Sequence, residues 1–172
     1  MEFSDPVKLP DGRYFVGTST GNGPVYVSLK NTVIFDPNSP EDISLKLSDG
    51  DVQTVNEWDS KCVEAAIENS TKWFHKEISA EVIKSYFQSS LDSGVLDALP
   101  LVNAKGKVTT AYFDAAKNQI QKIEDNTSAS VLLQLDGLWF LRKTFGPVWR
   151  LVQVRVKKTA EPVRCMLDDD SD

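Results

Sequence analysis

The residues best suited to chemistry in this sequence are aromatic and cationic, and most of them gather near its C-terminal end. Aromatic rings stack on nucleic-acid bases, contributing about 1–3 kcal/mol per base, and cations contact the phosphates between those bases. Rings and cations that alternate along strands therefore predict a surface for single-stranded nucleic acid. The candidate binding residues are Tyr26, Trp139, Phe140, Arg142, Lys143, Trp149, Arg150, Arg155, Lys157 and Lys158.

The central part of this surface is an expected strand over residues 148–158. Side chains alternate between the two faces of a strand. Trp149 would therefore share one face with Leu151, Gln153, Arg155 and Lys157. The opposite face would carry Val148, Arg150, Val152, Val154 and Val156. A second interpretation stays open, in which Trp139, Phe140 and Trp149 are core residues and the cations form a solvated face.

Other chemistries find little support in the sequence. His75 is the one imidazole, and no Gly-x-Ser-x-Gly motif supplies a nucleophile for it. The glycine-rich stretch 17–23 lacks the Lys-Ser/Thr pair of a phosphate-binding loop, and residues 49–51 lack the ligand spacing of an EF-hand. Two cysteines and this histidine fall short of the four ligands of a structural zinc site. We expect no enzyme activity, no cofactor and no metal.

Charge is distributed unevenly along the chain, although its net value is −6. Residues 137–164 carry seven basic side chains and one acidic side chain, whereas residues 165–172 carry four aspartates and no base. An acidic segment beside a basic one indicates either solubility alone or a mobile anionic peptide. Such a peptide would occupy the basic groove when nucleic acid is absent and contact a partner protein when the groove is filled. The candidate partner-binding residues are Asp168, Asp169, Asp170 and Asp172.

The composition is that of a soluble globular domain. At 172 residues the chain has the length of one domain, and its hydrophobic content of 41% is ordinary. No apolar run approaches the 18 residues or so of a membrane-spanning helix. The first five residues have neither the basic nor the apolar region of a signal peptide. We expect an intracellular protein.

Hydrophobic periodicity divides the chain into a β, an α and a second β region. Residues 10–47 contain short β-rich runs between turn residues, and residues 99–158 end in two long apolar strands with a turn at 145–147. Between them, residues 48–93 have helical spacing, with Ser48 and Ser79 as expected N-caps. This order predicts an α+β, mainly β domain over residues 1–160, in which a strand meander or small barrel is interrupted by a helical insertion at about 48–93. Residues 161–172 would form a disordered, flexible acidic tail.

Two stretches of the sequence resemble one family. The stretch Ser130-Val131-Leu132-Leu133-Gln134-Leu135-Asp136-Gly137-Leu138-Trp139-Phe140, continued from Phe145-Gly146-Pro147 to Val154, resembles its C-terminal strands. The helical stretch from Trp58 to Asn69-Ser70-Thr71-Lys72-Trp73-Phe74 resembles its helical pattern. The family is that of the phage gene-2.5-like single-stranded-DNA-binding proteins found in large nucleocytoplasmic DNA viruses.

The resemblance implies an OB-like barrel, single-stranded DNA binding in viral replication or recombination, and an acidic tail that contacts replication enzymes such as the viral DNA polymerase or helicase. It places the protein at a replication site in the host cytoplasm or nucleus, and a homodimer remains open. Trp73 and Phe74 would seat the helical insertion on the barrel. The alternative is a non-enzymatic, virion-associated or protein-interaction module that never touches nucleic acid and uses its acidic surface instead.

Overall fold

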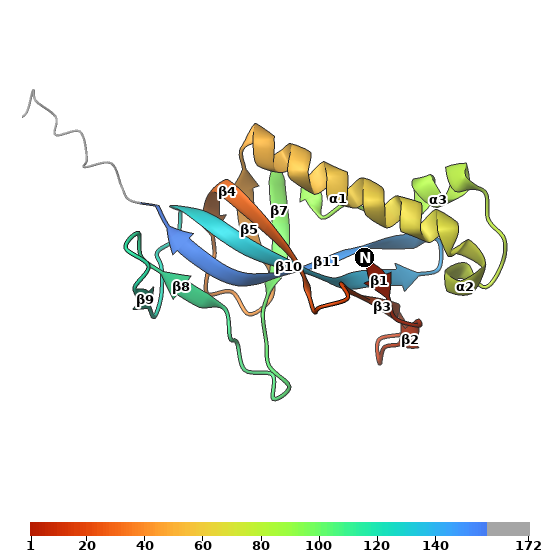
Figure 1. Cartoon of the computed structure of the whole chain (residues 1–172), viewed down its shortest axis with the longest axis horizontal. Coiled ribbons are helices and arrows are strands. Elements are labelled where there is room, and N and C mark those ends of the chain that lie inside the picture. Colours follow the sequence, from red (N-terminus) through yellow and green to blue (C-terminus); the bar gives the residue numbers. More distant parts are fainter. Residues whose placement is uncertain (158–172) are drawn as a thin grey trace, which may run out of the picture.

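The computed structural model describes residues 1–157, which form a mostly β fold with helices between its strands (Figure 1). The strands are β1 Glu2–Phe3, β2 Val7–Lys8, β3 Tyr14–Ser19, β4 Val25–Phe35, β5 Ile43–Leu47, β6 Leu91–Asp92, β7 Val95–Pro100, β8 Ala111–Phe113, β9 Gln119–Ile120, β10 Thr127–Leu141 and β11 Thr144–Val156. The helices are α1 Asp49–Glu68, α2 Ser70–Phe74 and α3 Ala80–Tyr86. The expected β-α-β order is therefore present.

Five strands pair in a closed cycle within one mixed sheet. β4 pairs with β5, β5 with β7, β10 with β4, and β10 with β11, all antiparallel, and the parallel pairing of β11 with β7 completes the cycle. The core fills the inside of this cycle with alternating apolar residues such as Leu29, Leu45, Leu96, Leu133 and Leu151. The remaining strands extend the sheet on either side.

The β10–β11 hairpin is the longest feature of the sheet, and its turn differs from the predicted one. Leu141 pairs with Thr144, so the turn lies at Arg142 and Lys143 instead of residues 145–147. Pro147 lies inside β11, opposite Leu138. Proline is tolerated here because the segment on the other side of this stretch donates to its carbonyl groups: the N–H of Gln88 bonds to Phe145 at 2.8 Å and the hydroxyl of Ser90 to Pro147 at 3.4 Å. Neither bond requires an N–H group at position 147. The prediction of a turn at Gly146-Pro147 is therefore wrong, because both residues pair with β10 inside the ladder.

β4 is a long strand whose pairing with β10 is irregular at one point. Its buried positions change from odd to even numbers between Leu29 and Thr32, where the register with β10 shifts. The two backbone N–H groups at this irregularity, of Lys30 and Asn31, donate to the carboxylate of Asp51 at 3.1 and 2.8 Å. Because Asp51 lies in the first turn of α1, the start of the helix stabilises the irregular point of the strand.

α1 and α3 begin where the sequence predicts, but the helical segment ends at Tyr86, and β6 occupies the end of the expected helical range 48–93. The side chains of Ser48 and Ser79 each accept a hydrogen bond from a backbone N–H, of Asp51 and Val82 respectively, both at 3.3 Å. α1 lies along the sheet (Figure 1) and buries Val55, Cys62, Ala65 and Ala66 against it.

An aromatic cluster attaches α2 to the hairpin. The rings of Trp73 and Phe74 lie 5.5 and 5.4 Å from that of Phe140, in edge-to-face geometry, and Phe74 also lies 5.8 Å from Phe145. Edge-to-face pairs at these separations are favourable beyond their buried area. The prediction that Trp73 and Phe74 seat the helical segment on the sheet is confirmed.

Candidate nucleic-acid interface

A polar and basic surface covers the outward side of β4, β10, β11 and β8, which we call the outer sheet face. The strand register builds it: Arg155 of β11 pairs with Ser130 of β10 on one side and with Phe113 of β8 on the other. One step along, Leu132 pairs with both Gln153 and Ser28. Paired residues lie about 5 Å apart and project from the same side of the sheet. The face consists of Tyr26, Ser28, Lys30, Phe113, Lys117, Ser130, Leu132, Gln134, Gln153 and Arg155.

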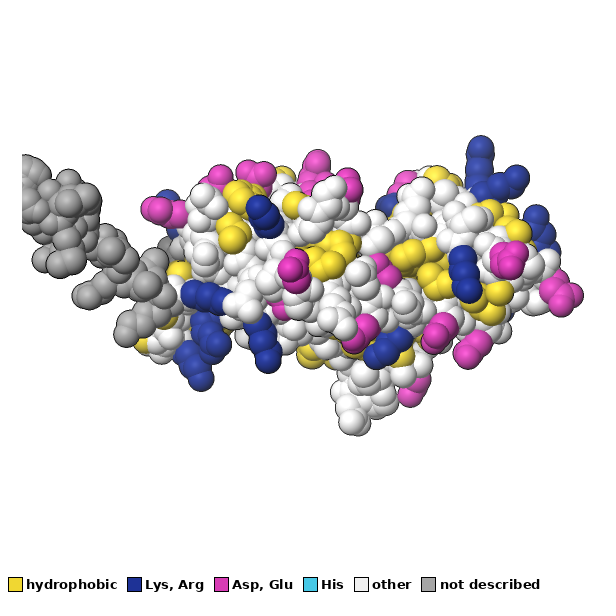
Figure 2. Space-filling view, turned by 90° about the horizontal axis from the view of Figure 1, so that it is seen from above, with side chains coloured by type: hydrophobic (Ala, Val, Ile, Leu, Met, Phe, Trp, Pro, Cys, Tyr) yellow, Lys and Arg dark blue, Asp and Glu magenta, His cyan; other side chains and the backbone are white. Residues whose placement is uncertain are grey.

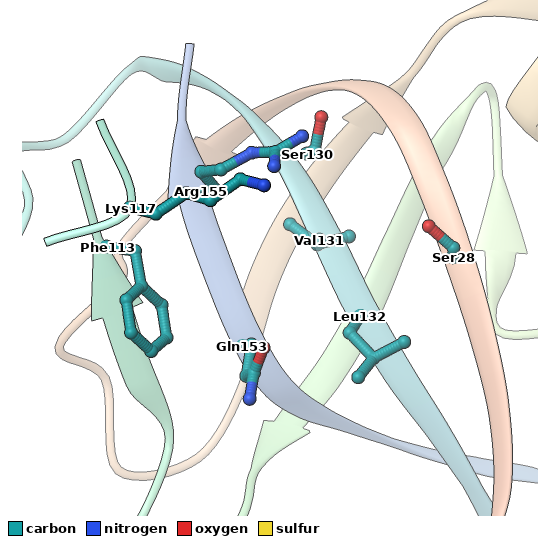
Figure 3. A pocket seen from close by; sticks show the side chains of 8 residues that line it. All are labelled: Ser28, Phe113, Lys117, Ser130, Val131, Leu132, Gln153 and Arg155. Carbon is teal, nitrogen blue, oxygen red and sulfur yellow. The ribbon is translucent and has the colours of Figure 1, made fainter. Parts of the chain in front are cut away.

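A hollow of about 360 Å³ lies in this face. It is lined by Ser28, Phe113, Lys117, Ser130, Val131, Leu132, Gln153 and Arg155 (Figure 3). The side chains of Arg155 and Lys117 extend together across β11 toward Ser130, and the ring of Phe113 and the amide of Gln153 lie further along the strands. One aromatic ring, two cations and several hydrogen-bonding groups thus converge on one concavity.

Apart from Arg150, which pairs with Gln134 and is bonded to Asp136, the cations of this face have no carboxylate partners among residues 1–157. None of the salt bridges within that range involves Lys30, Lys117 or Arg155. Lys157 continues the basic strip at the end of β11, where its ammonium donates to the side chain of Asn31. Figure 2 shows lysine and arginine side chains gathered at the end of the molecule that carries β8 and β9. This surface can attract an anionic chain and offer it ring contacts.

Two of the predicted stacking residues lie in the core. Trp149 is 2% exposed and Phe140 is 4% exposed, so neither ring has a face to offer a base. For these two residues the core interpretation holds and the predicted stacking role is corrected. Both residues occupy strand positions whose side chains point into the core.

The predicted alternation of β11 also fails at one point. Leu132 pairs with Gln153 and Leu133 pairs with Leu151, which leaves Val152 as an extra residue. This β-bulge reverses the faces, because one additional residue shifts the period of two. Gln153 and Arg155 consequently point outward although Trp149 and Leu151 point inward. A strict alternation had placed all four on one face.

Arg150 is engaged within the protein. Its Nε donates to Asp136 at 3.1 Å and its Nη1 donates to the carbonyl of Pro100 at 3.0 Å, and the side chain is only a quarter exposed. It ties the hairpin to β7, which leaves only the remaining N–H groups of the guanidinium for the predicted phosphate contact. Trp139 is half-buried on the hairpin beside Gly146.

The other predicted residues fall in three places. Tyr26, 51% exposed, lies on the outer sheet face with Arg155, and Lys157 lies at its margin. Arg142 and Lys143 lie at the opposite end of the hairpin. Lys158, Asp168, Asp169, Asp170 and Asp172 lie outside the described residues.

Sequence reasoning missed Phe113 and Lys117, which the structure adds to the interface. Phe113 lies at the end of the short strand β8, Ala111–Phe113. Its place beside Arg155 depends on a parallel pairing between segments some 40 residues apart. No local pattern reports such a pairing, and Lys117 lies in the turn that follows.

The carboxyl group of Asp59 and the thiol of Cys62 lie away from this face, in α1, and are buried. Burial raises the pKa of Asp59 in α1, although a hydrogen bond from Ser89 acts in the opposite direction. Burial raises the pKa of the Cys62 thiol to about 12, and the nearby charge of Asp59 makes a smaller contribution in the same direction. A thiol of that pKa is a poor nucleophile at neutral pH. Within residues 1–157, no cluster of three or more His, Cys, Asp or Glu could hold a metal ion, and no helix is long and apolar enough to cross a membrane.

Comparison with known proteins gives a family and a fold. Residues 31–166 match the sequence model of a family described as a family of unknown function (DUF5871). No curated protein matches the sequence.

Among solved structures, similar chains include the single-stranded DNA-binding protein from bacteriophage Enc34, alone and in complex with ssDNA. Both align with a TM-score of 0.52 and 12% identity; the complex covers 92% of this chain and 97% of that chain, and the protein alone 98% and 97%. A C-terminal truncation of the phage protein aligns with a TM-score of 0.52 and 11% identity, over 94% of this chain and 98% of that chain. At this identity the likeness establishes a shared fold.

Proposed function

This chain belongs to the family of unknown function DUF5871, and we propose that it binds single-stranded DNA, without sequence specificity, through the outer sheet face. The observation that carries the proposal is the hollow in which Phe113, Lys117 and Arg155 converge. A ring for stacking beside cations that have no carboxylate partner within residues 1–157 is the arrangement that binds single strands regardless of sequence. Tyr26, two positions along β4 from Ser28, would receive a neighbouring base.

The strand connections support this function independently of the side chains. In chain order the five strands of the closed cycle are β4, β5, β7, β10 and β11. Around the cycle their order is β4-β5-β7-β11-β10, so the last two strands exchange places. We infer that they form a small OB-like barrel, a fold that binds oligonucleotides on its surface. The likeness to a phage protein described as binding single-stranded DNA supports the same inference.

The biological setting is a wider part of the proposal. We propose that the chain is a non-enzymatic viral protein of DNA replication or recombination, related to the phage gene-2.5-like proteins of large nucleocytoplasmic DNA viruses, and that it acts at the intracellular site of viral replication. The four aspartates of residues 165–172 would contact a polymerase or helicase, or compete with DNA for the basic face. Self-association as a homodimer is compatible with either role.

The test is a titration of fluorescently labelled oligo-dT, and of a duplex of equal length, with the full chain. We expect a rise in anisotropy with oligo-dT at low salt, and much weaker binding of the duplex, because paired bases cannot reach the ring of Phe113. Deleting residues 165–172 should strengthen the binding if the aspartates compete. Absence of binding to oligo-dT by both the full and the shortened chain would overturn the proposed function in favour of a protein-interaction module.

A further inference from the structure

A second hollow, of about 200 Å³, lies at the tip of the β10–β11 hairpin, far from the outer sheet face. The hairpin turn, the end of α2, the segment after it, and β3 meet there. Arg155 and Lys143 are 12 residues apart in sequence, and β11 alone spans about 40 Å at 3.3 Å per residue, so one nucleotide cannot contact both hollows. The second hollow is lined by Tyr14, Trp73, Phe74, His75, Lys76, Ile78, Tyr86, Phe140, Arg142 and Lys143.

The lining combines cations with aromatic walls. Lys76, Arg142 and Lys143 lie around it with His75, and no carboxylate is among the lining residues. Within residues 1–157, none of these four takes part in a salt bridge. Lys72, one turn earlier in α2, is by contrast paired with Asp5 at 2.6 Å. The positive charge at this hollow is therefore available to an anionic ligand.

The rings form the apolar part of the site. Phe74 lies 6.0 Å from Tyr86 and 5.4 Å from Phe140, so these rings support one another. Tyr14 is 37% exposed and its ring meets the imidazole of His75 edge-to-face at 6.2 Å. A planar group entering the hollow would thus meet the ring of Tyr14 with a rigid aromatic wall behind it.

The backbone at two lining residues adopts an unfavourable conformation. Arg142 has φ of 53° and His75 has φ of 60°, both in the left-handed region where glycine or asparagine is preferred. A tight hairpin turn and a helix C-terminus are the two places where glycine would fit best. Both positions instead carry a side chain that lines the hollow. Unfavourable conformations of this kind concentrate at ligand-binding positions.

We propose that this hollow is a second nucleotide-binding site, which holds one nucleoside monophosphate unit with its phosphate against Arg142 and Lys143 and its base against Tyr14. A guanidinium at a turn can bind a phosphate with two hydrogen bonds, and an ammonium adds charge. The hollow has room for no more than a single unit, part of which stays outside it, so the ligand is a free nucleotide or the 5′-phosphorylated end of a strand. This inference does not rest on the proposed function of the outer sheet face, because it involves different residues.

The test uses isothermal titration calorimetry on the full chain with dTMP and with thymidine, which lacks the phosphate. We expect dTMP to bind at least about tenfold more tightly than thymidine, and R142Q/K143Q to remove that difference. The matched control is K105Q/K107Q, which loses the same charge from the exposed loop between β7 and β8 and should leave dTMP binding unchanged. Equal affinity of dTMP and thymidine, or of R142Q/K143Q and the unsubstituted chain for dTMP, would overturn the proposal.

A second variant separates binding from folding. Arg142→Gly relieves the left-handed backbone and removes the guanidinium, so we expect an unchanged or higher melting temperature together with weaker dTMP binding. Weaker dTMP binding accompanied by a lower melting temperature would instead show that Arg142 supports the fold, and would overturn its assigned role.

Two arms distinguish the sources of the nucleotide. If a strand end is the ligand, a 5′-phosphorylated oligo-dT should bind more tightly than its 5′-hydroxyl form, and R142Q/K143Q should abolish the gain. If the ligand is a free nucleotide, dTMP binds while the 5′-phosphate leaves oligo-dT affinity unchanged. An aspartate-rich peptide that binds this site while dTMP does not would overturn the proposal in favour of a protein partner.

Discussion

Removing two cations from the outer sheet face should change the salt dependence of DNA binding by a calculable amount. The face presents Lys30, Lys117 and Arg155, with Lys157 at its margin, and we assume that each neutralises one phosphate. For single strands the slope of log K against log salt is about −0.7 per phosphate, so four contacts give about −2.8. The double variant K117Q/R155Q should reduce the slope to about −1.4.

The assay is fluorescence anisotropy with labelled oligo-dT at several salt concentrations. Between 50 and 200 mM salt the unsubstituted chain should lose affinity by about 50-fold and the double variant by about sevenfold. The matched control is K61Q/K84Q, which removes two cations from α1 and α3. It lowers the net charge equally but leaves the outer sheet face intact, so its slope should stay at about −2.8.

The control makes the result decisive. If both double variants change the slope equally, net charge rather than the outer sheet face governs binding, and the assignment of Lys117 and Arg155 is refuted. If K117Q/R155Q weakens binding at every salt concentration with no change of slope, these residues support the fold of the hollow without contacting phosphates.

Three further predictions concern single side chains. Phe113→Ala should weaken oligo-dT binding by about 5- to 150-fold, corresponding to about 1–3 kcal/mol of stacking. Phe113→Leu is the control: it keeps the apolar bulk, so any further difference between it and the unsubstituted chain is due to the aromatic ring. Equal affinity of the Ala variant and the unsubstituted chain would exclude stacking at this residue. Trp149→Ala should lower the free energy of unfolding by about 3–5 kcal/mol in a urea melt followed by circular dichroism, since the ring is fully buried, and an unchanged midpoint would show that the residue is not in the core. Because the pKa of Asp59 is raised in the folded state, its protonation favours folding at low pH, and this contribution is lost as the pH rises through the raised pKa. Asp59→Asn should therefore stabilise the protein at neutral pH relative to the unsubstituted chain. The gain should be smaller below about pH 4, the pKa of an aspartate in the unfolded chain. The measurement is a series of thermal melts at different pH values, and a gain in stability that is constant with pH would contradict the burial of the charge.

A fourth prediction follows from the pKa of Cys62, about 12. In a Cys165→Ser variant, the thiol of Cys62 should react with a disulfide reagent at neutral pH only after unfolding by denaturant, because the thiolate is the reactive form. Rapid reaction of the native protein would show that α1 exposes this residue.

The sequence predicted the elements that local patterns determine. Ser48 and Ser79 cap helices because their hydroxyls accept from N–H groups three residues ahead, a relationship that depends on spacing alone. The aromatic pair Trp73 and Phe74 packs on the hairpin because large rings at the end of an amphipathic stretch need an apolar partner.

The candidate site was harder to predict because it depends on irregularities and on distant pairing. The bulge at Val152 reverses the outward face of β11, and nothing in the local sequence marks the extra residue. Trp149 was therefore predicted to share a face with Arg155, although it lies in the core. The ion pair of Arg150 with Asp136 joins residues 14 positions apart, which no local pattern reports. Phe113 reaches the interface only through the parallel pairing of β8 with β11. Alternation predicts which residues share a face only while the register is regular.

The most direct test of the account is to locate a bound strand on the protein by nuclear magnetic resonance. In a titration of the isotope-labelled chain with oligo-dT, the backbone signals of Tyr26, Phe113, Leu132, Gln153 and Arg155 should shift together, while those of α1 remain in place. Shifts confined to the helices, or no shifts under conditions where anisotropy reports binding, would contradict the claim that the outer sheet face holds single-stranded DNA.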